Sequence, residues 1–346
     1  MKINIASNEI IHFIGIGGIG MSGLAQIMKN MGFTIQGSDL SRNKNTERLV
    51  KMGIKVFFTH DKKNLRKATM AVISSAIKKN NKELKEAKQK NLPVFKRGDM
   101  LANIVALKKN IIITGSHGKT TTTSLVANIL LEAGLDPTII NGGVINSFRN
   151  NAQLGKSEWA VIESDESDGS FLKLPITYSI ITNVDKEHLD YYGNFENLKK
   201  SFSKFIEKTP SFGKSFVCID NKNLKSLVKK CKNKNYLTYG FNKDSNYQIS
   251  NVKKNSQNSV FDLKVKFGKE KSYKIKNLKV NLLGDHNISN VAASIAVSLN
   301  LGININKIKR ALNKFLGIQR RFTKVFSIKK KDFFDDYAHH PTEIKQ

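Results

Sequence analysis

Short apolar runs alternate along the chain with stretches whose apolar residues recur at helical spacing. The pattern begins with an apolar run at 10–14, a helical stretch at 21–31 and a second strand pattern at 33–36. Continuous apolar runs bounded by glycine and polar residues are typical of strands buried on both faces. Further strands are expected at 55–58, 71–74 and 93–95, with a lysine-rich helix at 82–90 before the last of them.

The same alternation resumes at Asn110 and predicts a second parallel sheet. A strand at 111–113 precedes a helix at 121–133, and further strands are expected near 137–140, 160–163 and 178–182. Residues 242–283 differ, because short apolar stretches alternate there with turns rich in lysine and asparagine, which favours an antiparallel extension. The whole pattern predicts an α/β fold with mostly parallel sheets and helices on both faces.

The net charge of +30 raises the possibility of a nucleic-acid-binding protein. Only 8 of the 58 basic residues are arginine, and the lysines are scattered with asparagine through the whole chain. Proteins that recognise nucleic acids by sequence rely on bidentate arginine contacts and on aromatic side chains that stack on bases, and neither is concentrated here. We therefore interpret the charge as a solvated, compositionally biased surface and expect no specific nucleic-acid partner.

Cysteine content and hydropathy narrow the class further. Cys218 and Cys231 are the two cysteines, with no metal-type spacing, so buried thiols are expected rather than a disulfide scaffold or structural zinc. No run of about 18 apolar residues occurs and the N-terminus has no signal-peptide pattern. We expect a cytoplasmic enzyme without membrane insertion, and the sequence leaves its oligomeric state open.

A glycine-rich turn follows the first predicted strand. Gly15-Ile16-Gly17-Gly18-Ile19-Gly20 fits the G-x-G-x-x-G fingerprint between a strand and a helix, where the backbone approaches a diphosphate. Asp39 lies about 20 residues further on, after Ser38, where an acidic side chain meets a ribose hydroxyl in such folds. By itself this half of the chain is typical of an NAD-linked dehydrogenase, which is one alternative.

A second phosphate-binding pattern spans residues 111–121. An apolar strand leads into Gly115-Ser116-His117-Gly118-Lys119-Thr120-Thr121, which then continues as a helix. The helix N-terminus, the two glycines and the lysine charge together form a site for a nucleoside triphosphate, and Thr120 is placed to reach its Mg²⁺. The loop is tighter than the common G-x-x-x-x-G-K-[ST] form, because Ile113 stands where the first glycine belongs. Two such sites in one chain suggest two phosphorylated ligands.

Three clusters in the second region could supply the chemistry. An acidic run, Glu163–Asp168, follows the strand at 160–163, and a polar run with Asp185 and His188 follows the strand at 178–182. Glu163 and Thr120 offer oxygen ligands suited to Mg²⁺, whereas His188 alone has the character of a polar loop residue. In the third cluster, at 284–290, Asn287 and Asn290 could bond an adenine edge, or Asp285 or Asn287 could simply cap the following helix.

Seven motifs in order along the whole chain resemble the Mur ligase family: Gly-Ile-Gly-Gly-Ile-Gly-Met-Ser-Gly-Leu-Ala at 15–25, Gly-Ser-Asp at 37–39, Gly-Ser-His-Gly-Lys-Thr-Thr-Thr-Thr at 115–123, Glu-Ser-Asp-Glu-Ser-Asp at 163–168, Gly-Asp-His-Asn-Ile-Ser-Asn at 284–290, Arg-Arg-Phe at 320–322 and Asp-Asp-Tyr-Ala-His-His-Pro-Thr-Glu at 335–343. The motif at 15–21 is most similar to the branch that joins L-alanine to UDP-N-acetylmuramate. The resemblance implies an ATP-dependent amide ligase of peptidoglycan precursor synthesis that works through an acyl phosphate. Other ligases of this fold, a murein-peptide ligase or a folylpolyglutamate synthase, remain alternatives.

The resemblance also implies roles for individual residues. The first glycine loop would bind the UDP part of the substrate rather than NAD, through Gly17, Gly18, Gly20, Ser38 and Asp39. ATP would occupy Gly115, Ser116, His117, Gly118, Lys119, Thr120 and Thr121, with His286 and Asn290 near its adenine. Mg²⁺ would be held by Thr120, Glu163 and His188. Arg320 or Arg321 would approach the phosphates, so that the catalytic set is Lys119, Glu163, His188, Arg320 and Arg321.

These observations predict three regions. Residues 1–108 are expected to be a Rossmann-like UDP-substrate domain, residues 109–318 a central P-loop ATPase-type domain, and residues 319–346 the beginning of a third, Rossmann-like domain. Tyr337 and His339 match family positions near the amino-acid pocket of that third domain. Because 28 residues cannot bury a core of their own, we expect the chain to be a C-terminally incomplete ligase that would not join alanine by itself.

Overall fold

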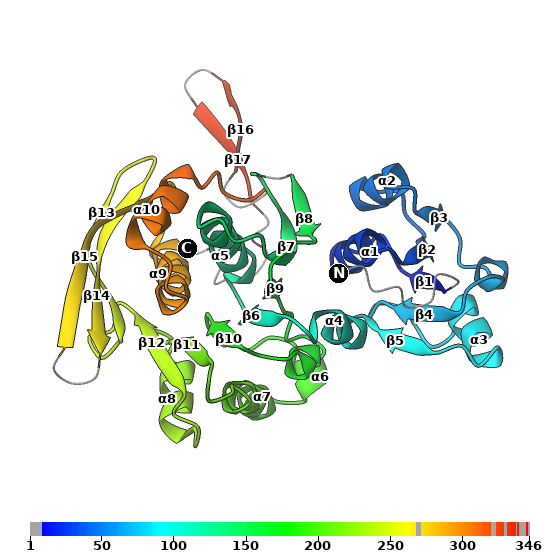
Figure 1. The fold of residues 1–346 in the computed structure, drawn as a ribbon, viewed down its shortest axis with the longest axis horizontal. Helices are drawn as coiled ribbons and strands as arrows, with labels where there is room; N and C mark the ends of the chain where they lie inside the picture. Colours follow the sequence, from blue (N-terminus) through cyan, green and yellow to red (C-terminus); the bar gives the residue numbers. More distant parts are fainter. Residues whose placement is uncertain are drawn as a thin grey trace.

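The computed structural model describes residues 9–147, 149–267, 271–319, 323–328, 331–336, 338 and 344. It contains a five-stranded sheet, a ten-stranded sheet and a two-stranded hairpin, in that order along the chain (Figure 1). Helices pack against the first two sheets, so the predicted α/β class with parallel sheets is confirmed.

The N-terminal sheet is wholly parallel, with the strand order β3-β2-β1-β4-β5. Chain order reverses between β1 and β4, and the carboxyl ends of the strands at such a switch point form the ligand crevice of open α/β sheets. Its strands are β1 (Ile10–Ile14), β2 (Thr34–Ser38), β3 (Lys55–Phe57), β4 (Met70–Ile73) and β5 (Val94–Lys96). Its helices are α1 (Ile19–Asn30), α2 (Lys44–Lys51), the 3₁₀ turn η1 (Lys62–Leu65), α3 (Lys82–Gln89) and α4 (Arg97–Val105).

The central sheet has the order β15-β14-β13-β12-β11-β10-β6-β9-β7-β8. Strands β12 to β7 in this order run parallel, and β8 adds an antiparallel edge. Its strands are β6 (Lys109–Thr114), β7 (Thr138–Ile145), β8 (Asn150–Gln153), β9 (Trp159–Glu163), β10 (Tyr178–Ile181), β11 (Lys214–Cys218), β12 (Tyr236–Gly240), β13 (Tyr247–Lys254), β14 (Ser259–Phe267) and β15 (Lys271–Val280). The accompanying helices are α5 (Lys119–Glu132), η2 (Ser170–Lys173), α6 (Leu189–Tyr192), α7 (Phe195–Glu207), α8 (Lys222–Lys230), α9 (Asp285–Asn300) and α10 (Ile305–Lys314).

The middle of this sheet is fully apolar for a physical reason. Ile111, Ile112 and Ile113 on β6 are all 0% exposed, because β9 and β10 flank this strand and helices cover the sheet. A strand covered on both faces has no polar side, which explains the continuous apolar run in the sequence. Strands β13, β14 and β15 are antiparallel, as the alternating pattern at 242–283 predicts.

Two helices of the N-terminal domain, α2 and α4, were not anticipated. Helix α2 is short and polar, but it begins with a capping box in which the Asn43 side chain accepts from Thr46 N and the Thr46 side chain bonds back to the Asn43 backbone. This reciprocal cap satisfies N–H groups that the helix itself leaves open. Hydrophobic periodicity misses α2 because only Thr46 and Leu49 of this helix are buried.

The edge strand β8 connects the two sheets. Asn151 Nδ2 donates to Ile19 O at the start of α1 (3.0 Å), and Asn150 Nδ2 donates to Gln26 Oε1 on the same helix (2.9 Å). Arg48 on α2 donates to Asn150 Oδ1 (3.1 Å) and Asn151 Oδ1 (2.9 Å). The central sheet therefore contacts the helix that follows the first glycine loop.

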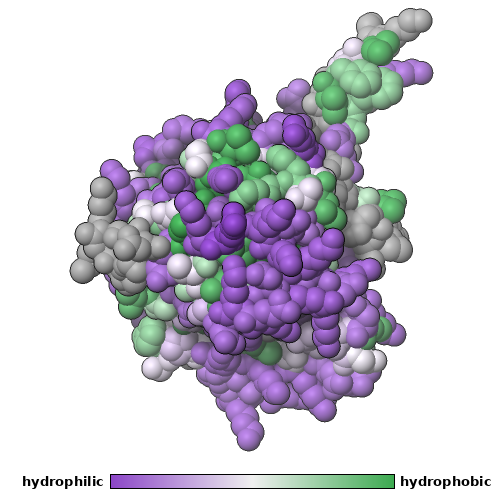
Figure 2. Space-filling view, turned by 90° about the vertical axis from the view of Figure 1, so that its right-hand side faces the viewer, coloured by the Kyte–Doolittle hydropathy of each residue, from purple (hydrophilic) through white to green (hydrophobic). Residues whose placement is uncertain are grey.

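The hairpin of β16 (Thr323–Ile328) and β17 (Lys331–Asp335) projects from the rest of the molecule (Figure 1). The side view shows a largely hydrophilic face with apolar residues gathered on this projection (Figure 2). Val325, Phe326, Ile328, Phe333 and Phe334 are the exposed apolar residues of the hairpin. Among the described residues, no helix has the length and hydropathy needed to cross a bilayer.

Candidate functional site

The carboxyl ends of three adjacent parallel strands meet at one edge of the central sheet. Strand β6 leads into the phosphate loop, β9 ends at Glu163 of the acidic run, and β10 leads into the polar run that begins at Thr182. Parallel pairing places these three segments side by side, as expected for a ligand crevice in an open α/β sheet.

The phosphate loop needs glycine at both ends. Gly115 has φ +130° and Gly118 has φ +84°, which are backbone conformations that side chains with a β-carbon rarely adopt. Asn183 holds the loop from β10, because its backbone oxygen accepts from Ser116 N (3.1 Å) and its Oδ1 accepts from His117 N (2.8 Å). His117 Nε2 also lies 3.1 Å from the Asp185 carboxylate.

Lys119 begins α5 and turns back across the loop. Its Nζ donates to Gly115 O (2.6 Å), Ser116 O (3.2 Å) and both carboxylate oxygens of Glu166 (3.0 and 3.2 Å). Glu166 is 1% exposed. Lys119, the lysine expected at the phosphates, is therefore paired with Glu166. No individual role was assigned to this buried carboxylate from the sequence.

Burial and the neighbouring carboxylates shift the pKa of Lys119 in opposite directions. Burial alone would lower the pKa of Lys119, but the carboxylates of Glu166, Asp165 and Glu163 raise it above its usual value, so the ammonium persists. Burial raises the pKa of Glu166, and the attraction of Lys119 only partly offsets this effect. A further cation beside Glu166 would therefore stabilise the charged form of this carboxylate.

Thr120 and Glu163, two of the three expected metal ligands, lie together. Thr120 Oγ1 donates to Glu163 Oε1 (3.0 Å), and Gly142 N on β7 donates to Glu163 Oε2 (2.5 Å). A β-carbon on Gly142 would collide with this carboxylate, so the glycine allows β7 to approach it. Consecutive glycines at 142 and 143 inside a strand are the sequence signal for this close approach.

The third expected ligand, His188, lies with a different group. Its Nε2 is 3.8 Å from Glu166 Oε1, and one ligand atom each from Asp165, Glu166 and His188 lie within 4.8 Å of one another. Two carboxylates and an imidazole can hold a divalent cation. Glu163 is not part of this group, so the expected set divides between two neighbouring clusters within the described part of the chain.

Helix α9 approaches the phosphate loop from the other side. Asn290 is 6% exposed, and a β-carbon on Gly118 would lie 2.7 Å from its Oδ1. The alternative in which Asp285 or Asn287 caps α9 is wrong, because Gly284 is the N-cap and no side chain accepts from the first turn. Instead Asn287 Nδ2 donates to Leu283 O (2.8 Å), and Asp285 pairs with Lys254 (2.7 Å). His286 lies exposed in the first turn.

The N-terminal glycine loop is organised by its own domain. Gly17 N donates to Asp39 Oδ2 (2.8 Å), and Gly17 O accepts from Asn45 Nδ2 (3.0 Å). Ser38 is fully buried, and its hydroxyl contacts Glu83 (2.5 Å) and His60 (3.0 Å) below the loop. Asp39 therefore holds the loop at Gly17, while Gly18 and Gly20 lie at the start of α1.

The remaining predicted residues, Arg320, Arg321, Tyr337 and His339, lie outside the described residues.

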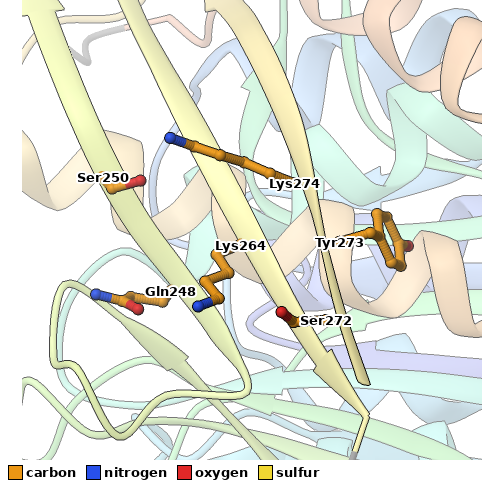
Figure 3. A pocket seen from close by; sticks show the side chains of 6 residues that line it. All are labelled: Gln248, Ser250, Lys264, Ser272, Tyr273 and Lys274. Carbon is orange, nitrogen blue, oxygen red and sulfur yellow. The ribbon is translucent and has the colours of Figure 1, made fainter. Parts of the chain in front are cut away.

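A separate hollow of about 400 Å³ lies on the face of β13, β14 and β15 (Figure 3). On β13 and β14 the lining residues alternate with buried ones, as on the solvent side of an antiparallel sheet, whereas β15 contributes three consecutive exposed residues. The residues are Gln248, Ser250, Lys264, Ser272, Tyr273 and Lys274. None of them belongs to either nucleotide motif, so the hollow is not the site that the motifs define.

The fold and the paired phosphate loops define a nucleotide-dependent ligase of the Mur ligase family, and the chain belongs to this family. Residues 10–109 match the "Mur ligase family, catalytic domain" and residues 113–298 match the "Mur ligase middle domain".

Individual relatives sharpen this assignment. The chain is 59% identical to the UDP-N-acetylmuramate–L-alanine ligase of Pelagibacter ubique (strain HTCC1062), a match that covers 100% of this chain and 75% of that protein. It is 45% identical to the protein of the same name from Brucella anthropi, covering 100% and 73%. The solved UDP-N-acetylmuramate–alanine ligase of Thermotoga maritima superposes with a TM-score of 0.85 at 30% identity, covering 97% of this chain and 75% of that one.

Proposed function

We propose that this protein is an ATP-dependent ligase that joins L-alanine to the lactyl carboxylate of UDP-N-acetylmuramate during peptidoglycan precursor synthesis. The observation that carries the proposal is 59% and 45% identity, over the whole chain, to two proteins named for this reaction. The two phosphate loops on separate sheets support it, because a UDP-linked substrate and ATP require separate anion sites.

Amide formation from a carboxylate requires activation, because a carboxylate is a poor electrophile. One carboxylate oxygen attacks the γ-phosphorus of ATP, which gives an acyl phosphate and ADP. The alanine amine then attacks the carbonyl carbon, phosphate departs with the C–O bonding electrons, and the nitrogen loses its proton. Carboxylate and triphosphate repel each other, so the site must supply positive charge before the first step can occur.

The chain supplies that charge at the end of β6. In the proposed complex the triphosphate lies on the backbone N–H groups of residues 115–121, and the Lys119 ammonium neutralises its phosphates. Arg320 or Arg321 adds a further charge, and His286 and Asn290 lie toward the adenine. The glycines at 17, 18 and 20 receive the UDP diphosphate, while Tyr337 and His339 belong to the amino-acid pocket.

A divalent cation fits the donor set beside Lys119. Asp165, Glu166 and His188 would hold it, because their ligand atoms already lie within 4.8 Å of one another and burial disfavours the lone Glu166 charge. Thr120 and Glu163 form a second pair of oxygen donors near the same loop. When bound there, Mg²⁺ would offset the negative charge of the transferring phosphoryl group.

Phosphate release by the full-length protein tests the proposal. Release should require ATP, UDP-N-acetylmuramate and L-alanine together, and the product should gain the mass of an alanyl residue. Stimulation by a preformed peptide in place of L-alanine would favour a murein-peptide ligase, a class represented by a solved structure that is 26% identical to this chain with a TM-score of 0.79. Reduction of NAD without ATP consumption would contradict both.

A further inference from the structure

Strand β15 forms one edge of the central sheet. It is the last strand in the sheet order, and among the described residues it pairs only with β14. The pairing is regular at 271–275 and is then interrupted by a bulge, where Lys309 Nζ of α10 donates to Lys276 O (3.1 Å). An edge strand presents backbone N–H and C=O groups that no neighbouring strand satisfies, so the 271–275 stretch can accept a further strand.

Two hollows flank this stretch. The first is the hollow of about 400 Å³ on the solvent face, into which Lys264, Ser272 and Lys274 point (Figure 3). In the same view the Tyr273 ring lies on the other side of β15 from the Lys274 side chain. Because successive side chains of a strand point to opposite faces, an added strand would direct alternate side chains toward the two hollows. The second hollow, of about 470 Å³, is lined by Tyr273, Lys274, Ile275, Lys276, Leu299, Ile305 and Lys309.

The first hollow favours negative charge. Lys264 and Lys274 are direct cross-strand partners, and like charges placed opposite each other destabilise a sheet. The Asp262 carboxylate pairs with Lys274 (3.1 Å), and it also accepts hydrogen bonds from Asn277 N (2.9 Å) and Asn251 Nδ2 (2.8 Å). One carboxylate thus faces two ammonium groups, and a carboxylate of a bound segment beside Lys264 would offset the remaining repulsion.

The second hollow favours an apolar side chain. Leu299 at the end of α9 and Ile305 at the start of α10 are both half-buried there, and Tyr273 is 45% exposed. An apolar side chain placed between them would remove their remaining apolar surface from water.

The charge of the edge decides which strand can be added. Four of the ten residues of β15 are lysine, and neither β15 nor α10 contains an acidic residue. A second copy of this chain would place lysines against lysines, and lysine on an edge strand disfavours such self-pairing. An acidic segment is attracted by the same lysines.

We propose that the 271–275 edge of β15 binds an extended, acidic segment of a partner protein by strand addition. Backbone hydrogen bonds to β15 hold the segment, and its alternating side chains give specificity. Acidic side chains lie beside Lys264 and Lys274, and apolar ones lie between Tyr273, Leu299 and Ile305. None of these residues belongs to a nucleotide motif, so the interaction is additional to the proposed ligase reaction.

Fluorescence anisotropy with labelled synthetic peptides tests the proposal on the full-length protein. A peptide of alternating glutamate and valine should bind. A peptide of the same composition with all glutamates first lacks the alternation, and a peptide of alternating glutamate and proline lacks half of the N–H groups. Both should bind at least about tenfold more weakly. Hydrogen exchange at residues 271–275 should slow when the alternating peptide is bound.

Two variants test the two hollows separately. Lys264→Glu should weaken binding of the alternating peptide at least about tenfold, because it turns an attraction into a repulsion. Tyr273→Ser should weaken it about threefold through loss of apolar contact. Lys229→Glu is the matched control, since it makes the same change of charge at an exposed position on α8, which packs on β11. Its affinity should stay within about twofold of the wild type.

Equal affinity for the three peptides would overturn the proposal, because binding would then depend on composition alone. Equal losses in Lys264→Glu and Lys229→Glu would also overturn it, since they would indicate an effect of overall charge. A wild-type dimer in sedimentation experiments that Tyr273→Ser dissociates would show that a second copy occupies the edge instead. A single-stranded oligouridylate that displaces the peptide and slows exchange at 271–275 more strongly than the peptide does would replace the protein partner by RNA.

Discussion

The pKa values of two buried glutamates, Glu83 and Glu166, shift in opposite directions because their surroundings differ. Glu83 is 0% exposed, and burial alone would raise its pKa, but His12, 3.5 Å from its carboxylate, and hydrogen bonds from Ser38 and Asn64 together lower it below its usual value. Burial raises the pKa of Glu166, and its single strong partner, Lys119, does not reverse the shift. Around Glu83 the partners outweigh burial, whereas at Glu166 burial and the neighbouring Asp165 charge outweigh the attraction of Lys119.

Glu83→Gln tests the network beneath the N-terminal glycine loop. Because the folded-state pKa of Glu83 is lowered, its stabilising contribution is present above pH 4.5 and is lost as pH falls through the lower folded value. We expect the variant to lose about 2 kcal/mol at pH 7. The difference in melting temperature from the wild type should shrink as the pH falls from 5 to about 3.

Glu86→Gln on the same helix provides the comparison. Glu86 pairs with Lys90 near the surface (3.4 Å), and such i,i+4 pairs contribute about 0.5 kcal/mol or less. Its melting temperature should follow that of the wild type at every pH. A Glu83→Gln difference that stays constant from pH 7 to pH 3 would contradict the charge-based explanation.

Lys119→Ala should separate the two nucleotide sites. We expect ATP-dependent phosphate release to disappear while calorimetry still detects UDP-N-acetylmuramate binding, because Lys119 begins α5 beside the central sheet and the glycine loop follows β1 of the other sheet. The variant should also lose about 3 kcal/mol of stability, since Glu166 would remain buried without its partner.

Lys119→Ala combined with Glu166→Gln should recover most of that stability without recovering activity. Recovery of phosphate release in the double variant would show that the lysine serves Glu166 rather than ATP.

At the scale of elements, strands were predictable and short polar helices were not. The apolar runs at 10–14, 111–113 and 160–163 all lie within strands, because a strand buried on both faces must be apolar throughout. Helix α2 lacked such a signal, although the capping box of Asn43 and Thr46 was visible in the sequence. Side-chain partners within loops were harder still, since they depend on rotamers that sequence spacing does not determine.

The site illustrates that limit. The sequence showed polar runs after the strands at 111–113, 160–163 and 178–182, and the strand order of the structure brings these runs together. The sequence could not show that Lys119 would choose Glu166 rather than Glu163, or that His188 would lie with Asp165 and Glu166. The close approach of Arg97 to Gly20 was likewise not predictable, because these residues are 77 positions apart and no motif links them.

Gly118→Ala tests the junction between α5 and α9. The new methyl group would meet Asn290 Oδ1 at 2.7 Å at a residue with φ +84°, so the loop must shift. We expect ATP affinity, measured by calorimetry, to fall at least about tenfold, as for a backbone strain of 1–3 kcal/mol placed in the site.

Gly134→Ala is the control for backbone conformation alone. Gly134 has φ +85° but nothing within 4 Å of an added β-carbon, so its variant carries the same conformational strain without the contact. It should lose stability yet bind ATP with wild-type affinity. Equal loss of ATP affinity in both variants would show that the contact with Asn290 is unimportant.

At the scale of the whole molecule, the two sheets are joined through β8 and α1. Arg48→Gln removes the guanidinium that holds both Asn150 and Asn151. We expect faster proteolytic cleavage around residues 106–109, where the chain passes from α4 to β6, because domain contacts of this kind are modest and polar. Small-angle scattering should show a larger radius of gyration, while ATP affinity stays the same.

Arg66→Gln serves as the control, since Arg66 is exposed and remote from β8. Its cleavage rate and scattering should match the wild type. Arg48→Gln with an unchanged cleavage rate would mean that the remaining contacts of Asn151 and Gln26 hold the domains without it.

The order of strands in the central sheet has a consequence for how the protein is made. Strand β6 emerges from the ribosome early, but its neighbours β9 and β10 end at residues 163 and 181, and α9 reaches the phosphate loop only at Asn290. All strands of the N-terminal sheet, in contrast, lie within residues 10–96. During synthesis the N-terminal sheet can therefore be complete while β6, before the phosphate loop, is still an unpaired apolar strand, and nascent chains of intermediate length expose that strand to aggregation.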